Sequence, residues 1–234
     1  MEKYIRAIQL SNKRVGSTFL QNAINSHPDI MGIDEVFVNM ARKPGMRKSG
    51  FVPYLRSDLN TPKEYIENVI YKTYPNKNTI FKIMYNQITY HQGLMEYIKG
   101  KSIPMIHLMR KNLVKQIISG LTAATTKHNP VIIEPKRLFN MVKEAHRFNE
   151  YWKKELKGNI KLTLFYEDII GEVDGEKTYL SNNANIAVCD FFKVKQIKMY
   201  AKTKKKNKDD ISVYLPNIEK IKKEFKETKF QWMI

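Results

Sequence analysis

A group of small and positively charged residues follows the first apolar stretch of the chain, residues 4–10. It reads Ser11-Asn12-Lys13-Arg14-Val15-Gly16-Ser17-Thr18. Gly16 lets the backbone turn and approach a ligand closely, and the free N–H groups at the start of a following helix attract anions. Lys13 and Arg14 bring two positive charges to the same place. The pattern predicts a phosphate-binding loop; the alternative is an N-capped helix start beside unrelated cations.

A second pair of candidate binding residues follows the apolar stretch 103–109. Arg110 comes directly after this stretch, and Ser119 lies further along in a predicted helix over 112–125. A guanidinium fork and a hydroxyl group can together hold one phosphate. The alternative is a surface arginine and an unrelated helical serine.

Two residues near other predicted strand ends could take part in the chemistry. Lys82 lies near the end of the apolar stretch 79–85, and Glu35 follows a short predicted strand over 30–33. The lysine could contact a transferring group or only extend its ammonium to the surface. The carboxylate could act as a general base or only pair with one of the many lysines.

Three further residues compete with Glu35 for the role of general base. Asp34 is its neighbour, His91 opens a predicted helix over 91–99, and His107 lies inside a predicted strand. We expect His107 to be a buried core histidine, because the residues around it are apolar. Glu35 is the preferred base because it follows a short predicted strand and could lie at the ligand-binding edge of the sheet, with Asp34 as the nearest alternative.

These residues must be positioned by strands and helices that alternate along the chain. Apolar stretches predict strands over 4–10, 79–85, 103–109 and 160–167. Helical patterns cover 17–26, 61–74, 91–99, 112–125, 136–157, 186–192 and 216–227. This alternation predicts an α/β fold, a three-layer sandwich with a mainly parallel central sheet, in which ligands bind at the carboxyl ends of the strands. The stretches 38–60 and 170–184 predict long loops.

The composition indicates one basic globular domain over residues 1–234. The chain has 41 Lys and Arg against 23 Asp and Glu, a formal net charge of +18, which attracts polyanions without choosing among them. Cys189 is the only cysteine, so no disulfide can form within the chain. No apolar stretch reaches the roughly 18–20 residues that a membrane helix needs. We expect a cytoplasmic protein.

Four segments, in this order, resemble the PAPS-dependent sulfotransferases, where PAPS is 3′-phosphoadenosine 5′-phosphosulfate. The resemblance is stronger to the bacterial nodulation-type and trehalose-type enzymes than to the animal cytosolic phenol enzymes. The segments are Lys13–Leu20 followed by His27-Pro28; Ile106–Arg110 with Asn112, Leu113 and Ser119; Leu164–Ile169 with its Tyr-Glu-Asp triplet; and Lys202–Asn207 with Ile211, Asn217, Glu219 and Phe230–Met233. One departure is Val15, which stands where the family has a serine or another small residue.

The resemblance implies a P-loop-NTPase-like sulfotransferase fold and transfer of a sulfuryl group from PAPS to a hydroxyl or amine. It implies a carbohydrate or glycolipid acceptor and no required metal ion. It implies that loop 38–60 shapes the acceptor pocket and that segment 198–219 covers the cofactor. The implied cofactor-binding residues are Lys13, Arg14, Val15, Gly16, Ser17, Thr18, Phe19, Arg110, Ser119, Tyr166, Lys202 and Lys204.

The resemblance also implies a division of roles among the site residues. Arg14, with the backbone of the residues that follow it, holds the 5′-phosphosulfate, and Arg110 with Ser119 holds the 3′-phosphate. Lys82 contacts the bridging oxygen or the sulfuryl group. Glu35 follows the His-Pro pair as the catalytic glutamate of the bacterial enzymes does, and is the general base.

Three other classes of function remain open from the sequence. A nucleotide kinase would need the Walker lysine, which is absent, and a strand-end aspartate for magnesium, for which Asp168 is a poor stand-in. A nucleic-acid-binding protein would use the charge, but no helix-turn-helix, zinc-finger or RNP pattern occurs. A sulfotransferase fold that binds nucleotide without catalysis is the third.

Overall fold

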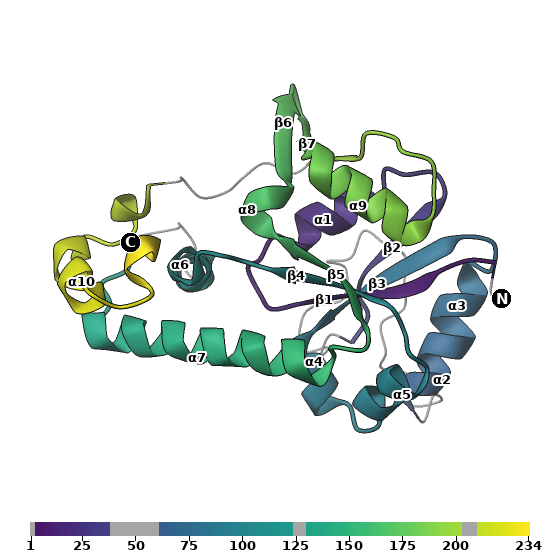
Figure 1. The fold of residues 1–234 in the computed structure, drawn as a ribbon, viewed down its shortest axis with the longest axis horizontal. Helices are drawn as coiled ribbons and strands as arrows, with labels where there is room; N and C mark the ends of the chain where they lie inside the picture. The colour runs from purple at the N-terminus through teal and green to yellow at the C-terminus, as the bar shows by residue number, and fades with distance from the viewer. Residues whose placement is uncertain (1–2, 38–60, 124–129, 203–209) are drawn as a thin grey trace.

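The central sheet has five parallel strands in the order β2-β3-β1-β4-β5 (Figure 1). In this computed structural model, residues 3–37, 61–123, 130–202 and 210–234 are described. The strands are β1 (Arg6–Ser11), β2 (Ile30–Glu35), β3 (Asn78–Met84), β4 (Met105–Met109) and β5 (Ile160–Phe165). The predicted α/β class and the mainly parallel sheet are confirmed, and so is the short strand after the first helix.

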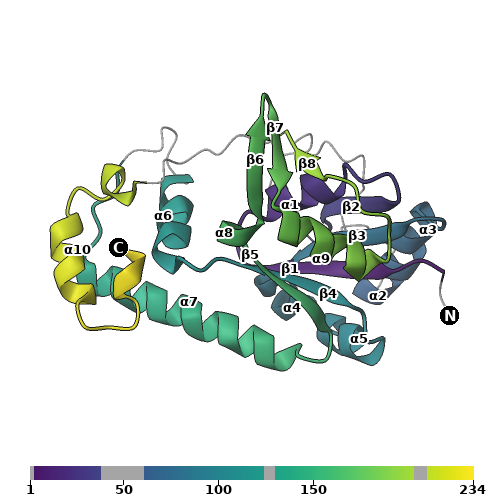
Figure 2. The same ribbon diagram turned by 45° about the horizontal axis from the view of Figure 1, so that its top comes forward.

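Helices cover both faces of this sheet (Figures 1 and 2). They are α1 (Ser17–Ile24), α2 (Pro62–Tyr65), a π-helical turn (Ile66–Ile70), α3 (Tyr71–Thr73), α4 (Tyr85–Tyr90), α5 (Leu94–Gly100), α6 (Leu113–Ala123), α7 (Pro135–Glu155), α8 (Tyr166–Ile169), α9 (Asn182–Phe192) and α10 (Ile218–Phe225), with 3-10 turns at Ile211–Val213 and Gln231–Met233. Because the sheet is covered on both sides, β3 is buried at every position.

Alternate residues of each strand pack against different helices. On one face Ala7 and Ile80 pack with α1 and α9. On the other face Ile8 and Phe81 pack with the helices over 62–100 and with the end of α7. The three-layer arrangement thus follows from strands that are apolar on both sides.

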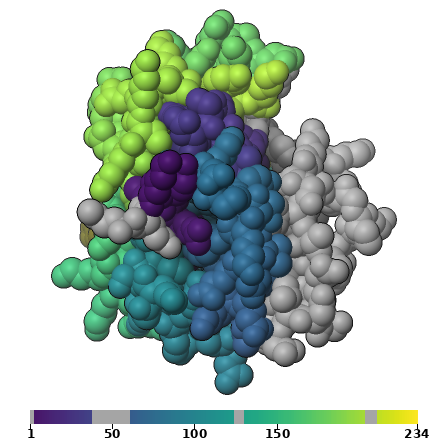
Figure 3. Space-filling model, turned by 90° about the vertical axis from the view of Figure 1, so that its right-hand side faces the viewer, coloured from purple at the N-terminus to yellow at the C-terminus, as the bar shows by residue number. Residues whose placement is uncertain are grey.

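A third apolar cluster lies beyond the sheet and forms a lobe at the end of the molecule opposite the N-terminus (Figure 1). It joins α6, the first half of α7, α10 and the last residues of the chain; Leu113, Val142, Phe225 and Met233 are among its buried members. Figure 3 shows the other end, where β1 begins between the segment that follows α9 and the α2–α3 helices. The carboxyl ends of the strands therefore point toward the lobe.

Two predicted elements differ from the structure. The predicted loop 170–184 contains strands β6 (Ile170–Asp174) and β7 (Lys177–Leu180), which pair with β8 (Tyr200–Ala201) in an antiparallel sheet. This hairpin projects away from the central sheet (Figures 1 and 2). The predicted helix 91–99 begins only at Leu94, as α5, because Gly93 has a φ of 77°. A further helix, α4, precedes it directly after β3 and was not predicted.

Candidate functional site

The loop between β1 and α1 has the backbone conformation of an anion-binding turn. Arg14 and Gly16 both have positive φ, at 64° and 79°. A Cβ on Gly16 would lie 2.2 Å from Cδ2 of Tyr166, so only glycine fits there. Gly16 caps α1 without a side-chain hydrogen bond, and the first N–H groups of a helix have no partner within it. Those groups are therefore placed to receive an anion.

Hydrogen bonds join this loop to the helix that follows β4. Arg14 donates from Nε to Oγ of Ser119 at 3.1 Å. Arg110 donates from Nη1 to the carbonyl oxygen of Arg14 at 3.2 Å, and Gln116 donates from Nε2 to that of Lys13 at 2.9 Å. Residues that are distant in sequence thus converge at the carboxyl ends of two adjacent strands, as the sequence predicted for Arg14, Arg110 and Ser119.

The residues that follow β5 complete this side of the site. The Arg110 guanidinium lies 4.9 Å from the centre of the Tyr166 ring, and its Nε lies 3.5 Å from Oε1 of Glu167. The Glu167 carboxylate also accepts hydrogen bonds from the backbone N–H groups of Lys111 and Asn112, at 2.8 and 3.2 Å. Burial lowers the pKa of Arg110, and the charge of Glu167 opposes this shift. Arg110 is therefore held in one position by a ring and a carboxylate.

We call residues 13–19 together with Arg110, Ser119 and Tyr166 the loop site. Two of its predicted members contribute only backbone. The side chains of Val15 and Phe19 are buried in the core on the α1 side of the sheet, so only their N–H groups are left for a ligand. Thr18 is exposed.

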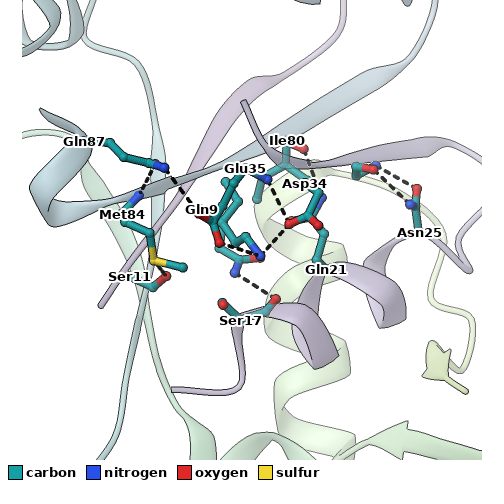
Figure 4. Close-up of polar contacts among 12 residues, drawn as sticks. Gln9, Ser11, Ser17, Gln21, Asn25, Asp34, Glu35, Ile80, Met84 and Gln87 are labelled. Atoms are coloured by element: carbon teal, nitrogen blue, oxygen red, sulfur yellow. Dashed lines mark hydrogen bonds and ion pairs between the residues drawn. The ribbon is translucent and has the colours of Figure 1, made fainter. Parts of the chain in front are cut away.

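A row of polar side chains crosses three strands beneath the loop site. Gln9 of β1 pairs with Lys82 of β3, which in turn pairs with Glu35 of β2. The row lies on the α1 side, because Ala7 and Ile80, which precede Gln9 and Lys82 by two residues, pack against α1. Gln9 donates from Nε2 to the carbonyl oxygen of Ser17 at 3.1 Å (Figure 4) and so ties the row to the start of α1.

Lys82 is a buried cation with two acidic neighbours. Its side chain is 2% exposed, and Nζ lies 2.5 Å from Oδ1 of Asp34 and 3.6 Å from Oε1 of Glu35. A buried ammonium requires such partners. The structure thus brings Lys82 and Glu35 together, as the two catalytic candidates require. It does not support the alternative that Lys82 extends its ammonium to the surface.

Gln87 is a member of this group that sequence reasoning missed. It donates from Nε2 to Oε2 of Glu35 at 3.3 Å, while its Oε1 accepts from the backbone N–H of Met84 at 2.8 Å (Figure 4). Glu35 is therefore held between an ammonium on one oxygen and an amide on the other. Glutamine is common in the first turn of a helix, so its residue type gave no signal. Its place just after the end of β3 is the one feature of the sequence that could have identified Gln87.

The two histidines that were candidate bases do not belong to the polar row. His107 is paired with Leu10, on the opposite face of the sheet from the polar row, and its Nε2 is hydrogen-bonded to the hydroxyl of Tyr85. Burial lowers the pKa of His107 to about 4. His91 follows α4 and packs its ring against Phe37 at 4.9 Å. The expectation that His107 is a core residue is confirmed.

The C-terminal residues expected over the cofactor are not brought to the loop site by the described part of the chain. Lys202 is exposed directly after β8, which pairs with the projecting hairpin. Between residues 210 and 219 the described chain belongs to the lobe, where Leu215 is buried. Lys204 and the predicted acceptor-shaping loop 38–60 lie outside the described residues.

Metal-binding clusters and membrane-spanning helices are both absent from the described ranges. Within residues 3–37, 61–123, 130–202 and 210–234, no group of three or more His, Cys, Asp or Glu side chains could hold a metal ion. No helix in the same ranges is both long enough and apolar enough to span a bilayer. Asp168, the aspartate considered for magnesium, instead pairs with the Lys111 ammonium at 2.6 Å.

Comparisons with protein-family models, with curated proteins and with solved structures found no match to this chain. The function is therefore inferred from the chemistry of the loop site and the polar row.

Proposed function

We propose that this protein is a sulfotransferase that uses PAPS as donor and a hydroxyl or amine, carried on a carbohydrate or glycolipid, as acceptor. The observation that carries the proposal is the loop site. Arg14, Arg110 and Ser119 meet at the start of α1, and the polar row with Lys82 and Glu35 lies directly beneath. Anion-binding groups and a carboxylate with a lysine thus share one edge of the sheet.

The residues of the loop site fit a nucleotide with two separate anionic ends. The Arg110 guanidinium and the Ser119 hydroxyl match one phosphate by charge and by hydrogen-bond geometry. Arg110 is oriented for this contact by Glu167, whose carboxylate lies 3.5 Å from its Nε, and by the loop backbone, to which its Nη1 donates. The Arg14 guanidinium and the N–H groups at the start of α1 match the other anionic end. Bound PAPS would supply the sulfuryl group.

The same residues can stabilise the charge that develops during transfer. Negative charge grows on the sulfuryl oxygens and on the departing phosphate oxygen, so fixed N–H groups and cations there lower the barrier most. In this proposal the N–H groups of Ser17 and Thr18 hold the phosphosulfate end, together with Arg14. Lys82 supplies a buried positive charge in the row below.

Glu35 is placed to take the proton of the acceptor hydroxyl. A general base must keep its carboxylate oriented and unprotonated. Gln87 holds one of its oxygens, and Lys82 lies near the other. Asp34 has a different role in this proposal, because it is the closer partner of the Lys82 ammonium and balances that charge.

The experiment that tests this function is a transfer assay with sulfur-labelled PAPS and a panel of acceptors made of sugars, glycolipids and phenols. Label should pass to at least one sugar or glycolipid, and Glu35→Gln should lower kcat by about 10²–10⁴-fold, the usual contribution of a general base. Asp29→Asn, an exposed carboxylate outside the row, is the matched control. Transfer to no acceptor, or equal turnover by both variants, would contradict the proposal.

A further inference from the structure

A small groove lies between α7 and the chain segment after α10. Phe139, Lys143, His146 and Arg147 line it from α7, and Lys229 and Phe230 line it from the C-terminal segment. Its volume is about 280 Å³. It belongs to the lobe and shares no residue with the loop site, so the inference drawn from it goes beyond the proposed function and does not depend on it.

The groove is positively charged throughout. Lys143, Arg147 and Lys229 line it together with His146, and no acidic residue is among the side chains that line it. Neither Lys143 nor Arg147 forms an ion pair with the described residues, although several other lysines of the lobe do, such as Lys222 with Glu219. The groove therefore presents cations whose charge is not neutralised by nearby carboxylates.

Aromatic rings hold these cations in place. The Lys143 ammonium lies 5.5 Å from the centre of the Phe139 ring, and the Lys229 ammonium lies 5.1 Å from that of Phe230. The two rings pack edge to face at 6.1 Å, and Phe230 is buried. Lysine side chains lose rotamer freedom when they bind, so cations already laid against fixed rings bind an anion at a lower entropic cost.

His146 is hydrogen-bonded to one of the lysines of the groove. Its Nε2 lies 2.9 Å from Nζ of Lys229. An ammonium group only donates hydrogen bonds, so Nε2 is the acceptor here. An anion in the groove would offer the ammonium a charged acceptor in place of the imidazole nitrogen, and a hydrogen bond to a charged acceptor is the stronger of the two.

We propose that this groove, named here the lobe groove, binds a sulfate or carboxylate group carried on a sugar. The Arg147 fork matches the two oxygens of such a group, and Phe139, which is partly exposed, offers apolar surface to a sugar ring. Its volume lies at the small end of ligand sites, which favours one or two sugar rings. Nucleic acid instead needs cations spread along a backbone, whereas these cations line one small groove.

A titration of the purified protein by calorimetry and NMR tests the proposal, with a disulfated heparin disaccharide as the probe. The double variant Lys143→Gln/Lys229→Gln should bind the disaccharide at least tenfold more weakly. The control Lys220→Gln/Lys223→Gln removes the same charge from α10 outside the groove and should change affinity less than twofold. The ring signals of His146 should shift on binding in the unaltered protein and in the control only.

Three results would overturn the proposal. Equal losses in both double variants would mean that only net charge matters. Equal affinity for sodium sulfate and for the disaccharide would show that the sugar is not recognised. Displacement of the disaccharide by a short DNA duplex at equal concentration would favour nucleic acid. Adenosine 3′,5′-bisphosphate binding should be unchanged in the groove variant, so failure here and failure of the sulfotransferase proposal are separable.

Discussion

At the residue scale, the site depends on side chains that orient other side chains. Gln87 is uncharged and Glu167 is one acidic residue among many, yet Gln87 holds Glu35 and Glu167 holds Arg110. The sequence predicts the site residues that follow an apolar strand or lie on the next helix, namely Arg14, Arg110, Ser119 and Glu35. It does not predict the roles of Gln87 and Glu167, because these are set by contacts between distant parts of the chain.

Gln87 is the residue whose replacement separates positioning from folding most clearly. We expect Gln87→Leu to lower kcat about tenfold with KM within twofold, because Glu35 keeps its charge but loses one of its two anchors. Gln87→Glu should lower kcat further, since it places a second carboxylate against Glu35. Steady-state kinetics on the acceptor found in the transfer assay measures both. A change in KM alone would contradict a positioning role.

Gly16 tests the conformation of the loop. Gly16→Ala places a Cβ against the Tyr166 ring at a backbone φ of 79°, and we expect a loss of about 1–2 kcal/mol in the free energy of unfolding from the left-handed backbone alone. Urea denaturation measures it. Gly100→Ala is the control, because nothing lies within 4 Å of its Cβ. Equal stability of both variants would contradict the left-handed conformation of Gly16.

At the element scale, the ends of secondary structures decide where the site forms. The residues of the loop site lie at the carboxyl ends of β1, β4 and β5. The start of α6 is held at the same edge, because Glu167, just after β5, accepts hydrogen bonds from the N–H groups of Lys111 and Asn112. The parallel strands were predictable from their apolar residues. The β6–β7 hairpin was not, because its strands are short and partly exposed and their pairing is completed by β8, distant in sequence.

Replacement of Glu167 should loosen α6 and Arg110 together. We expect Glu167→Gln to lower the free energy of unfolding by about 1 kcal/mol, because a carboxylate at a helix start interacts with its N–H groups more strongly than an amide does. Nucleotide affinity should fall as well, since Arg110 loses its ion pair. Chemical denaturation and a nucleotide titration measure the two effects. Loss of stability with unchanged affinity would contradict the link to Arg110.

The packing of β4 against α4 and α7 makes a prediction about pH. Burial lowers the pKa of His107 from 6.5 to about 4, so the unfolded chain takes up a proton at a higher pH than the folded protein does. Stability should therefore fall as the pH drops from 6.5 toward 4. His107→Asn should reduce this fall by about 2 kcal/mol or more. Unfolding measured at pH 7 and pH 5 tests it, and equal slopes for both proteins would contradict it.

At the scale of the whole molecule, the cations behind the net charge of +18 lie in several places with different roles. Part of it converges in the loop site, part lies in the lobe groove, and part forms exposed ion pairs such as that of Lys198 with Glu172. Composition alone predicted that the protein attracts anions. It could not predict where the cations gather, because that depends on which strands end side by side and on how the lobe packs against α7.

One measurement tests the central claim most directly: a calorimetric titration with adenosine 3′,5′-bisphosphate, with 5′-AMP and ATP as controls. The sulfotransferase proposal predicts tight binding that requires the 3′-phosphate and is lost in Arg110→Ala. Arg137→Ala, which removes an exposed arginine in the first turn of α7 that is not part of the loop site, should leave the affinity unchanged. Equal, salt-sensitive binding of all three nucleotides, unchanged in Arg110→Ala, would contradict the account and favour a general polyanion-binding protein.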